Sequence, residues 1–315
     1  MDILFIVIGL ALVLAGADRL TEGAAAIAEK FRVSEFIIGL TIVAVGTSMP
    51  EFVVSISAAL RGSSDMAIGN VVGSNIFNVF LILGLCATVS PLPLTRNNIR
   101  FDIPITLLAS VLLFLAASDT LLHTGDTDRI GRIEGVIMFI LYIALIVYTI
   151  RSSNRERDDA ENTVPRMKTP IAVFWTVAGL AALIGGSRLF IDGASALAHR
   201  MGISEAVIAI TLVAGGTSLP ELASSLASVI KGRKGMALGN VLGSNIFNIL
   251  FILGGSAMIS PLTLGDISLV DMVMVLLSAV LPFIFAFTFR GHSINRIEGV
   301  MMLIIYGTYI WQLIN

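Results

Sequence analysis

Residues 41–51 read Thr-Ile-Val-Ala-Val-Gly-Thr-Ser-Met-Pro-Glu, and residues 211–221 read Thr-Leu-Val-Ala-Gly-Gly-Thr-Ser-Leu-Pro-Glu. A second pair has the same offset of 170 residues: Met-Ala-Ile-Gly-Asn-Val-Val-Gly-Ser-Asn-Ile-Phe-Asn at 66–78 and Met-Ala-Leu-Gly-Asn-Val-Leu-Gly-Ser-Asn-Ile-Phe-Asn at 236–248. Self-similarity at one fixed offset indicates an internal repeat. The chain therefore contains two related halves.

The composition places these halves in a membrane. Of the 315 residues, 56% are hydrophobic and 13% are charged, whereas a soluble domain carries about 25% charged residues. The net charge of -2 excludes the concentrated basic surface that a nucleic-acid partner would need. We expect a polytopic protein of the cell's inner (plasma) membrane, embedded in the lipid bilayer, with no obligatory protein partner.

Apolar segments of about 20 residues, the length that crosses a bilayer, predict an all-α protein with ten transmembrane helices. The segments lie near 3–21, 34–60, 66–90, 101–121, 131–150, 170–190, 204–230, 236–260, 267–289 and 295–313. We divide the chain into a first five-helix repeat (1–150), a polar linker (151–169) and a second five-helix repeat (170–315), which together form one transport domain. Because five is odd, the second repeat is inverted relative to the first, as in many secondary transporters.

The distribution of basic residues predicts the orientation. Most of the 20 Lys and Arg residues fall in the linker and in the loops on the same side of the membrane. Cytoplasmic loops carry such an excess. We therefore expect both termini outside and the 151–169 loop in the cytoplasm.

Two carboxylates lie deep within apolar segments, Glu51 and Glu221, at equivalent places in the two halves. A charged side chain at this depth is costly and usually marks a substrate pathway. The alternative is a structural Glu that is paired or protonated within the bundle. The duplication and the absence of Lys or Arg from the same spans favour an ion site.

Pro50 and Pro220 precede the two carboxylates and predict that the second and seventh helices are broken. The breaks free backbone carbonyl oxygens one turn upstream. At helical spacing, the hydroxyl groups of the preceding Thr and Ser share a face with each Glu; these residues are Thr47, Ser48, Thr217 and Ser218. An ordinary proline kink with hydroxyls repairing the backbone is the alternative.

The following helix of each half carries Asn and Ser at steps of four, a polar stripe that we expect to face the carboxylates. The stripes are Asn70, Ser74 and Asn78, and Asn240, Ser244 and Asn248. We favour ion ligation for Ser74, Asn78, Ser244 and Asn248, and interhelical hydrogen bonding for Asn75 and Asn245. The Gly69-xxx-Gly73 and Gly239-xxx-Gly243 spacings predict close helix packing.

The assembled side chains offer only oxygen, which hard cations prefer. Two carboxylates neutralise one divalent ion, and a flexible set of six to eight oxygens suits Ca²⁺ better than Mg²⁺. Na⁺ uses the same oxygens, so the two ions would compete. Competition for one site is the physical basis of exchange. We expect Ca²⁺ and Na⁺ as transported ions, no cofactor and no enzymatic activity.

At these motifs the chain resembles the calcium/cation antiporter superfamily, in its compact prokaryotic sodium/calcium exchanger form. The resemblance implies that Glu51 and Glu221 bind Ca²⁺ together with the backbone oxygens of Thr47 and Thr217. It assigns to Na⁺ the residues Ser48, Ser74, Ser218, Ser244 and the carbonyls of Ala44 and Ala214, with Asn78 and Asn248 completing the centre. It also implies alternating access by sliding of the first and sixth helices.

One position departs from the family pattern. Many relatives have Asp where this chain has Asn248, and the resemblance associates that Asp with K⁺ transport in the potassium-dependent branch. The favoured hypothesis is an electrogenic Na⁺/Ca²⁺ antiporter that extrudes Ca²⁺. The alternatives are an H⁺/Ca²⁺ antiporter, a K⁺-dependent Na⁺/Ca²⁺ antiporter and, less favoured, a passive cation channel.

Overall fold

The computed structural model describes residues 2–118, 128–156, 167–201, 214–265, 267–288 and 292–314. In the first half the elements, with η for a π-helix, are α1 (Asp2–Phe31), α2 (Glu35–Ile38), η1 (Gly39–Val43), α3 (Ala44–Thr47), α4 (Met49–Leu60), α5 (Ser64–Ile76), η2 (Phe77–Leu83), α6 (Gly84–Val89), β1 (Leu92–Pro93), η3 (Asn98–Asp102), α7 (Ile103–Ala116), β2 (Arg129–Ile130) and α8 (Arg132–Glu156). In the second half they are α9 (Thr169–Arg200), α11 (Ala214–Thr217), α12 (Leu219–Ile230), α13 (Lys234–Ile246), η6 (Phe247–Leu253), α14 (Gly254–Ile259), β3 (Leu262–Thr263), α15 (Leu269–Phe285), β4 (Ser293–Ile294) and α16 (Arg296–Ile314).

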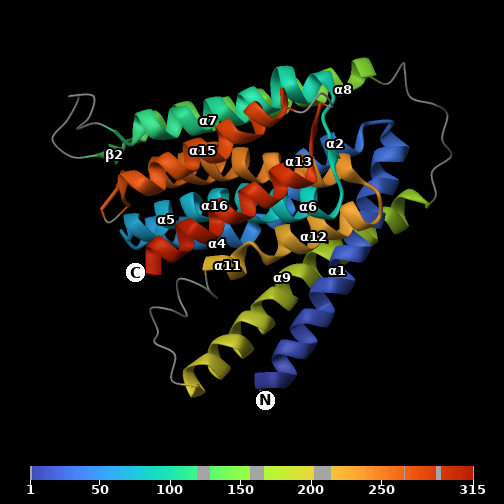
Figure 1. Ribbon diagram of the computed structural model, residues 1–315, viewed down its shortest axis with the longest axis horizontal. Helices are drawn as coiled ribbons and strands as arrows, with labels where there is room; N and C mark the ends of the chain where they lie inside the picture. The colour runs from blue at the N-terminus through green and yellow to red at the C-terminus, as the bar shows by residue number, and fades with distance from the viewer. Residues whose placement is uncertain are drawn as a thin grey trace.

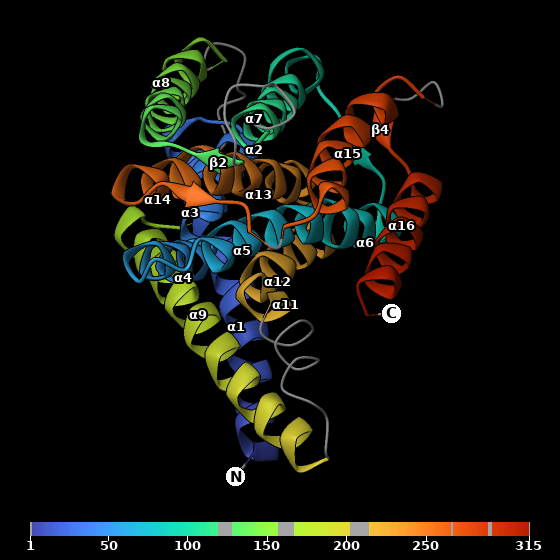
Figure 2. The ribbon, with the colours of Figure 1, turned by 90° about the vertical axis from the view of Figure 1, so that its left-hand side faces the viewer.

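The described part of the chain is almost entirely helical (Figures 1 and 2). Among the described residues, six helices are long and apolar enough to cross a bilayer, and the bent run from α2 to α4 makes a seventh. The multi-pass character expected from the sequence is confirmed. Two predicted features, the upstream part of the seventh helix (204–213) and most of the linker (157–166), lie outside the described residues.

Two long helices, α1 and α9, lie side by side and project from the remaining bundle in both ribbon views (Figures 1 and 2). They have 30 and 32 residues, about ten more than the sequence predicts. Their ionic residues, such as Arg19 and Glu22, suggest that the spans end there. The helix instead continues through them, and these residues find partners there: Arg19 pairs with Glu22 at 3.2 Å, and Lys231 at the end of α12 pairs with Glu22 at 3.1 Å.

Glycines seven residues apart hold α1 and α9 together. A Cβ atom built on Gly16 would lie 2.8 Å from the carbonyl oxygen of Gly179, and one on Gly9 would lie 2.7 Å from that of Gly186. Gly23 makes a similar approach to Ala172. The backbones therefore touch along an antiparallel interface that larger residues would force apart.

The two halves interleave in the rest of the bundle. The last helix of each half packs on the other half: α8 lies against α14, and α16 lies against α6. Two short antiparallel pairings, β1 with β4 and β2 with β3, join the same partners at their ends. One buried hydrophobic core contains residues of both halves, so each half buries its apolar side chains partly against the other.

The second small-residue motif brings the inner helices into backbone contact, as predicted. A Cβ atom on Gly239 would lie 2.2 Å from the Phe36 carbonyl oxygen, and one on Gly243 would lie 2.4 Å from that of Leu40. This contact sets α13 against α2 and η1. Among the described residues, a Cβ atom on Gly69 would meet only the Ile267 side chain, at 3.4 Å, and one on Gly73 would meet no heavy atom within 4 Å.

Replacing Gly16 by Ala should destabilise the protein by about 1–3 kcal/mol, the usual effect of overpacking, because the new methyl group would meet backbone atoms of α9. Gly185→Ala is the matched control, since a Cβ atom there has no described heavy atom within 4 Å. Thermal unfolding of both variants in detergent measures the difference. Equal melting temperatures would contradict the close α1–α9 packing.

Candidate ion-binding site

The helix that carries each buried carboxylate is broken one turn before it. Ser48 separates α3 from α4 with φ -83° and ψ 10°, and Ser218 separates α11 from α12 with φ -90° and ψ 8°. The first run bends by 49° at this point. Pro50 and Pro220 explain the breaks, since neither residue can donate the next helical hydrogen bond.

The breaks place each serine on the carboxylate of the other half. Ser48 Oγ donates to Glu221 Oε1 at 2.7 Å, and Ser218 Oγ donates to Glu51 Oε1 at 2.8 Å. All four side chains are buried, with at most 1% of their surface exposed. Two hydrogen bonds thus cross between the repeats and join both carboxylates in one centre.

This pairing corrects one detail of the sequence analysis. Helical spacing predicts that Ser48 shares a face with Glu51, its neighbour along the chain. The structure pairs Ser48 with Glu221 instead. The helical rule fails because Ser48 is itself the break, so its side chain does not follow the face of α4.

The serines of the next helix, Ser74 and Ser244, complete the crossed arrangement. Ser74 Oγ donates to Glu51 Oε1 at 3.4 Å and lies 3.2 Å from Ser218 Oγ. On the other side, Ser48 Oγ lies 3.0 Å from Ser244 Oγ. Glu51 therefore accepts hydrogen bonds from two serine hydroxyl groups, as expected from the polar stripe, whereas Ser244 is linked to Glu221 through Ser48.

Asn78 and Asn248 lie close to the start of η2 and η6, where the wider π-helical turn begins. Asn78 Nδ2 donates to Asn245 Oδ1 at 3.0 Å, and Asn248 Nδ2 donates to Asn75 Oδ1 at 3.2 Å. The expected interhelical bonds of Asn75 and Asn245 are thus present. Each pair uses the amide N–H of Asn78 or Asn248 and leaves its carbonyl oxygen unbound.

Four buried oxygens of the centre have no hydrogen-bond partner: Glu51 Oε2, Glu221 Oε2, Asn78 Oδ1 and Asn248 Oδ1. An unpaired buried acceptor is destabilising by about 1–3 kcal/mol. In the described part of the chain, no Lys or Arg forms an ion pair with either carboxylate. A cation would satisfy these oxygens and neutralise the carboxylates.

The donor chemistry selects hard cations. Within the described residues, no group of three or more His, Cys, Asp or Glu side chains is placed to hold a metal. The candidate centre instead combines two carboxylates with hydroxyl and amide oxygens. Such oxygen sets suit Ca²⁺ and Na⁺ rather than zinc or copper.

The remaining predicted residues surround the break points. Thr47 is buried, and its Oγ1 donates to the carbonyl of Val43 at 3.0 Å. The Ala44 carbonyl accepts the backbone N–H of Ser48 at 3.0 Å and the hydroxyl group of Thr47 at 3.4 Å. Ala214 begins α11 and Thr217, half-buried, ends it.

Two residues of the polar stripes, Asn70 and Asn240, support the site. The sequence indicates both residues but not the serines to which they bond. Asn70 Nδ2 donates to the Glu51 carbonyl at 3.1 Å and to Ser55 Oγ at 2.9 Å. In the other half, Asn240 Nδ2 donates to Ser224 and Ser225 at 2.9 and 2.8 Å. The signal that could have identified Ser55 and Ser225 is their equal place in the two halves, four residues after each Glu.

The profile of the family described as "Sodium/calcium exchanger protein" matches residues 1–151 and 171–315. Sodium/calcium exchanger MaX1 of Methanosarcina acetivorans is 34% identical over 343 residues, which cover 98% of this chain and 97% of that relative. Inner membrane protein YrbG of Escherichia coli is 35% identical over 312 residues, 97% of this chain and 94% of that one. A solved structure of the sodium-calcium exchanger NCX_Mj, soaked with 2.5 mM Na⁺ and 0.1 mM Ca²⁺, has a TM-score of 0.86 at 33% identity, covering 99% of this chain and 98% of its own.

Ca²⁺ should raise the melting temperature of the purified protein in detergent, because it binds the folded centre and not the unfolded chain. At about 100 times its dissociation constant a ligand stabilises by about 2.7 kcal/mol. Glu51→Gln should abolish this stabilisation, since the variant loses half of the formal charge of the centre. Glu134→Gln, in the first turn of α8, is the control and should keep the response. A full response in Glu51→Gln would contradict the assigned centre.

Proposed function

Because this chain belongs to the sodium/calcium exchanger protein family, whose members are cation/Ca²⁺ antiporters and not enzymes, we propose that it exchanges Na⁺ for Ca²⁺ by alternating access. The observation that carries the proposal is the crossed bonding of the two carboxylates. Ser48 binds Glu221 and Ser218 binds Glu51, so the negative charges of both carboxylates lie in one centre. Ca²⁺ and Na⁺ both need these charges and therefore occupy the centre in turn.

The proposed centre has the twelve residues that the sequence indicates. Glu51 and Glu221, with the backbone oxygens of Thr47 and Thr217, hold Ca²⁺. Na⁺ uses the hydroxyl groups and carbonyls of Ser48, Ser74, Ser218, Ser244, Ala44 and Ala214, and Asn78 and Asn248 complete both sets. The unpaired oxygens of both Glu and both Asn side chains support ion ligation by these four residues.

We propose that exchange is electrogenic and normally extrudes Ca²⁺. The two carboxylates carry a formal charge of -2, which one Ca²⁺ neutralises. If more than two Na⁺ replace it, each cycle moves net charge across the membrane. The inward Na⁺ gradient would then drive Ca²⁺ outward.

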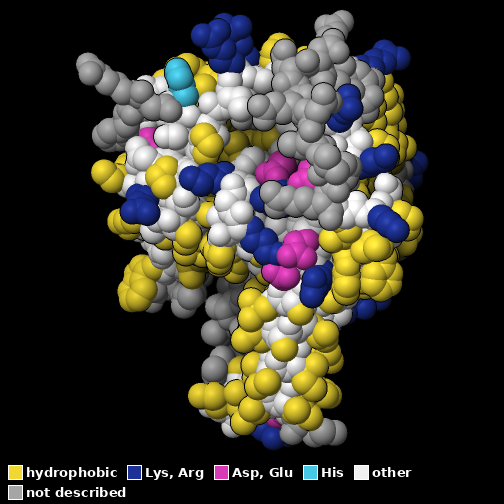
Figure 3. All heavy atoms as spheres, turned by 90° about the vertical axis from the view of Figure 1, so that its right-hand side faces the viewer, with side chains coloured by type: hydrophobic (Ala, Val, Ile, Leu, Met, Phe, Trp, Pro, Cys, Tyr) yellow, Lys and Arg dark blue, Asp and Glu magenta, His cyan; other side chains and the backbone are white. Residues whose placement is uncertain are grey.

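The proposed architecture is ten spans in two inverted five-helix repeats, 1–150 and 170–315, joined by the linker 151–169. Matching breaks at Ser48 and Ser218 and the reciprocal packing of α8 on α14 and α16 on α6 support the inversion. We propose that the protein lies in the cell's inner (plasma) membrane, with both termini outside and the linker in the cytoplasm. Numerous Lys and Arg side chains on the face seen in Figure 3 agree with the positive-inside rule.

Flux into proteoliposomes tests the function. Vesicles loaded with Na⁺ and diluted into Na⁺-free medium should accumulate radioactive Ca²⁺, whereas choline-loaded vesicles should not. Uptake that follows an imposed pH gradient and ignores Na⁺ would identify an H⁺/Ca²⁺ antiporter. Uptake that also needs K⁺ would identify the potassium-dependent type, and uptake without any counter-ion a channel.

The Ser74→Ala and Ser244→Ala double variant separates Na⁺ from H⁺ coupling. Each hydroxyl group lies against a carboxylate or its serine partner, and Na⁺ needs such ligands whereas a proton does not. Na⁺-driven Ca²⁺ uptake should fall at least about tenfold, the usual effect of losing groups that shape a metal site. Ser278→Ala is the control, because among the described residues this buried hydroxyl group bonds to its own helix alone, at the Val275 carbonyl. Unchanged uptake in the double variant would contradict Na⁺ ligation.

A further inference from the structure

One face of α12 is polar along its whole length. Glu221 is followed at helical spacing by Ser224, Ser225 and Ser228, and all four side chains are at most 1% exposed. Lys231 follows at the end of the helix. This row of oxygens begins at the proposed ion centre and ends at a charged residue. Buried polar groups do not pack better than apolar ones, so packing alone does not explain the row.

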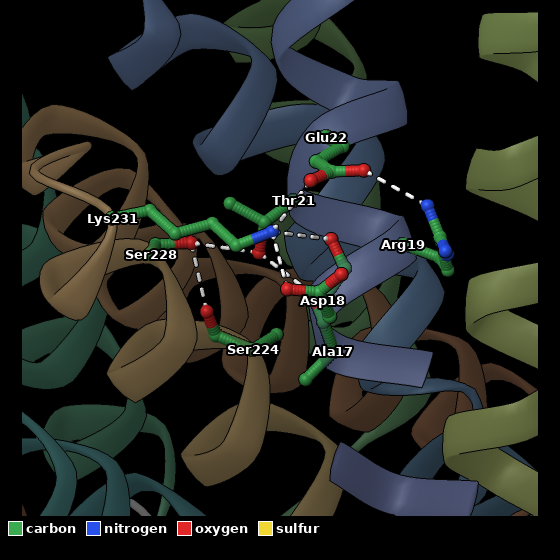
Figure 4. Close-up of polar contacts among 8 residues, drawn as sticks. All are labelled: Ala17, Asp18, Arg19, Thr21, Glu22, Ser224, Ser228 and Lys231. Atoms are coloured by element: carbon green, nitrogen blue, oxygen red, sulfur yellow. Dashed lines mark hydrogen bonds and ion pairs between the residues drawn. The ribbon is translucent and has the colours of Figure 1, made fainter. Parts of the chain in front are cut away.

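Hydrogen bonds follow this row from the centre to α1, and Figure 4 shows the part from Ser224 to α1. Asn240, which contacts the Glu221 carbonyl at 3.5 Å, donates to Ser224 Oγ at 2.9 Å. Ser228 Oγ donates to the Ser224 carbonyl at 2.7 Å and lies 3.3 Å from Thr21 Oγ1 of α1. The row is therefore covered by α1 at Thr21.

An ionic cluster closes the far end of the row. The ammonium group of Lys231 lies 2.5 Å from Asp18 Oδ1 and 3.1 Å from Glu22 Oε1, and it donates to the Asp18 carbonyl at 3.1 Å. Figure 4 shows Asp18 and Glu22 reaching from α1 toward Lys231. These contacts join α1 to the end of α12 across the row.

A cavity adjoins this cluster, since Glu22 and Lys231 are among its lining residues. It has a volume of about 390 Å³ and is lined by Glu22, Ala26, Glu29, Met167, Lys231 and Arg233. Figure 3 shows acidic and basic side chains together where α1 and α9 meet the bundle. The cluster thus lies between this cavity, which both acidic and basic side chains line, and a buried oxygen row that leads to the proposed ion centre.

The two repeats differ at this place. At the repeat offset, Glu22 and Lys231 correspond to Asp192 and Arg61, a pair of the same charges on α9 and α4. In the described part of the chain no ion pair joins Asp192 to Arg61. Correspondingly, α1 packs along α12, whereas α9 makes only slight contact with α4.

We propose that the oxygen row of α12 is the ion route to one side of the membrane, and that Lys231 with Asp18 and Glu22 is its gate. The gate is closed in this structure. When α1 leaves α12, the hydroxyl groups of Ser224 and Ser228 line the opened route, and Arg61 pairs with Asp192 to close the other side. This assignment rests on the proposed antiport, in which the centre opens to one side at a time.

The strength of the cluster fits a gate. Lys231 has 25% of its side chain exposed, and Asp18 and Glu22 have 47% and 39%. Partly exposed pairs of this kind contribute little stability. A contact this weak holds the closed state and still breaks in each cycle.

Thiol labelling tests the gate without any transport measurement. A Ser228→Cys reporter is placed in a Cys86→Ala background, and its reaction with a positively charged, water-soluble thiol reagent is followed in detergent and choline buffer. Lys231→Met should raise the labelling rate about fivefold, the change expected from the loss of about 1 kcal/mol that favours the closed state. Lys234→Met is the matched control and should leave the rate unchanged.

Arg61→Met should lower the labelling rate, because it weakens the pair that stabilises the state open at Ser228. Opposite effects of Lys231→Met and Arg61→Met support the paired gates. Equal rates in Lys231→Met and Lys234→Met, or shifts of both gate variants in the same direction, would overturn the proposal. If Lys231→Met does not fold, Glu22→Gln takes its place with the same expected direction. Labelling does not require transport, so a failed gate and a failed Na⁺/Ca²⁺ exchange are distinguishable.

Discussion

The structure depends on how an apolar helix bundle stabilises two buried carboxylates that lie close together. Glu51 and Glu221 receive hydrogen bonds from Ser218 and Ser48 across the repeat boundary. These bonds stabilise the carboxylates only in part, since one oxygen of each has no partner. These unpaired oxygens are the basis of the proposed ion site, whose two carboxylates would limit which ions it holds together.

The centre is nearly symmetric between the two repeats, whereas the two long helices, α1 and α9, pack differently against the rest of the bundle. The breaks at Ser48 and Ser218 and the Asn pairs are nearly equivalent in the two halves. The contacts of α1 and α9 are not, because α1 packs along α12, whereas α9 has no comparable packing along α4. The close glycine contacts hold α1 and α9 against each other, so the proposed opening of the gate would require both helices to move together.

Much of this centre could be predicted from the sequence. The repeated Pro-Glu pairs identify the breaks and the buried charges, and the repeated Asn and Ser stripes identify the facing helices. The partner of Ser48 could not be predicted, because helical spacing assigns it to Glu51 and only the crossing of the halves brings it to Glu221. The lengths of α1 and α9 were underestimated, since residues such as Glu22 resemble span ends until their partners on another helix are known. The π-helical turns at Asn78 and Asn248 also have no compositional signal.

The central claim is that one shared centre binds either Ca²⁺ or Na⁺. Equilibrium Ca²⁺ binding to the purified protein, titrated at increasing Na⁺, tests it most directly. The account predicts one Ca²⁺ per chain, with an apparent dissociation constant that rises more steeply than the first power of the Na⁺ concentration. Two independent Ca²⁺ ions per chain, or a Ca²⁺ affinity that Na⁺ leaves unchanged, would contradict it.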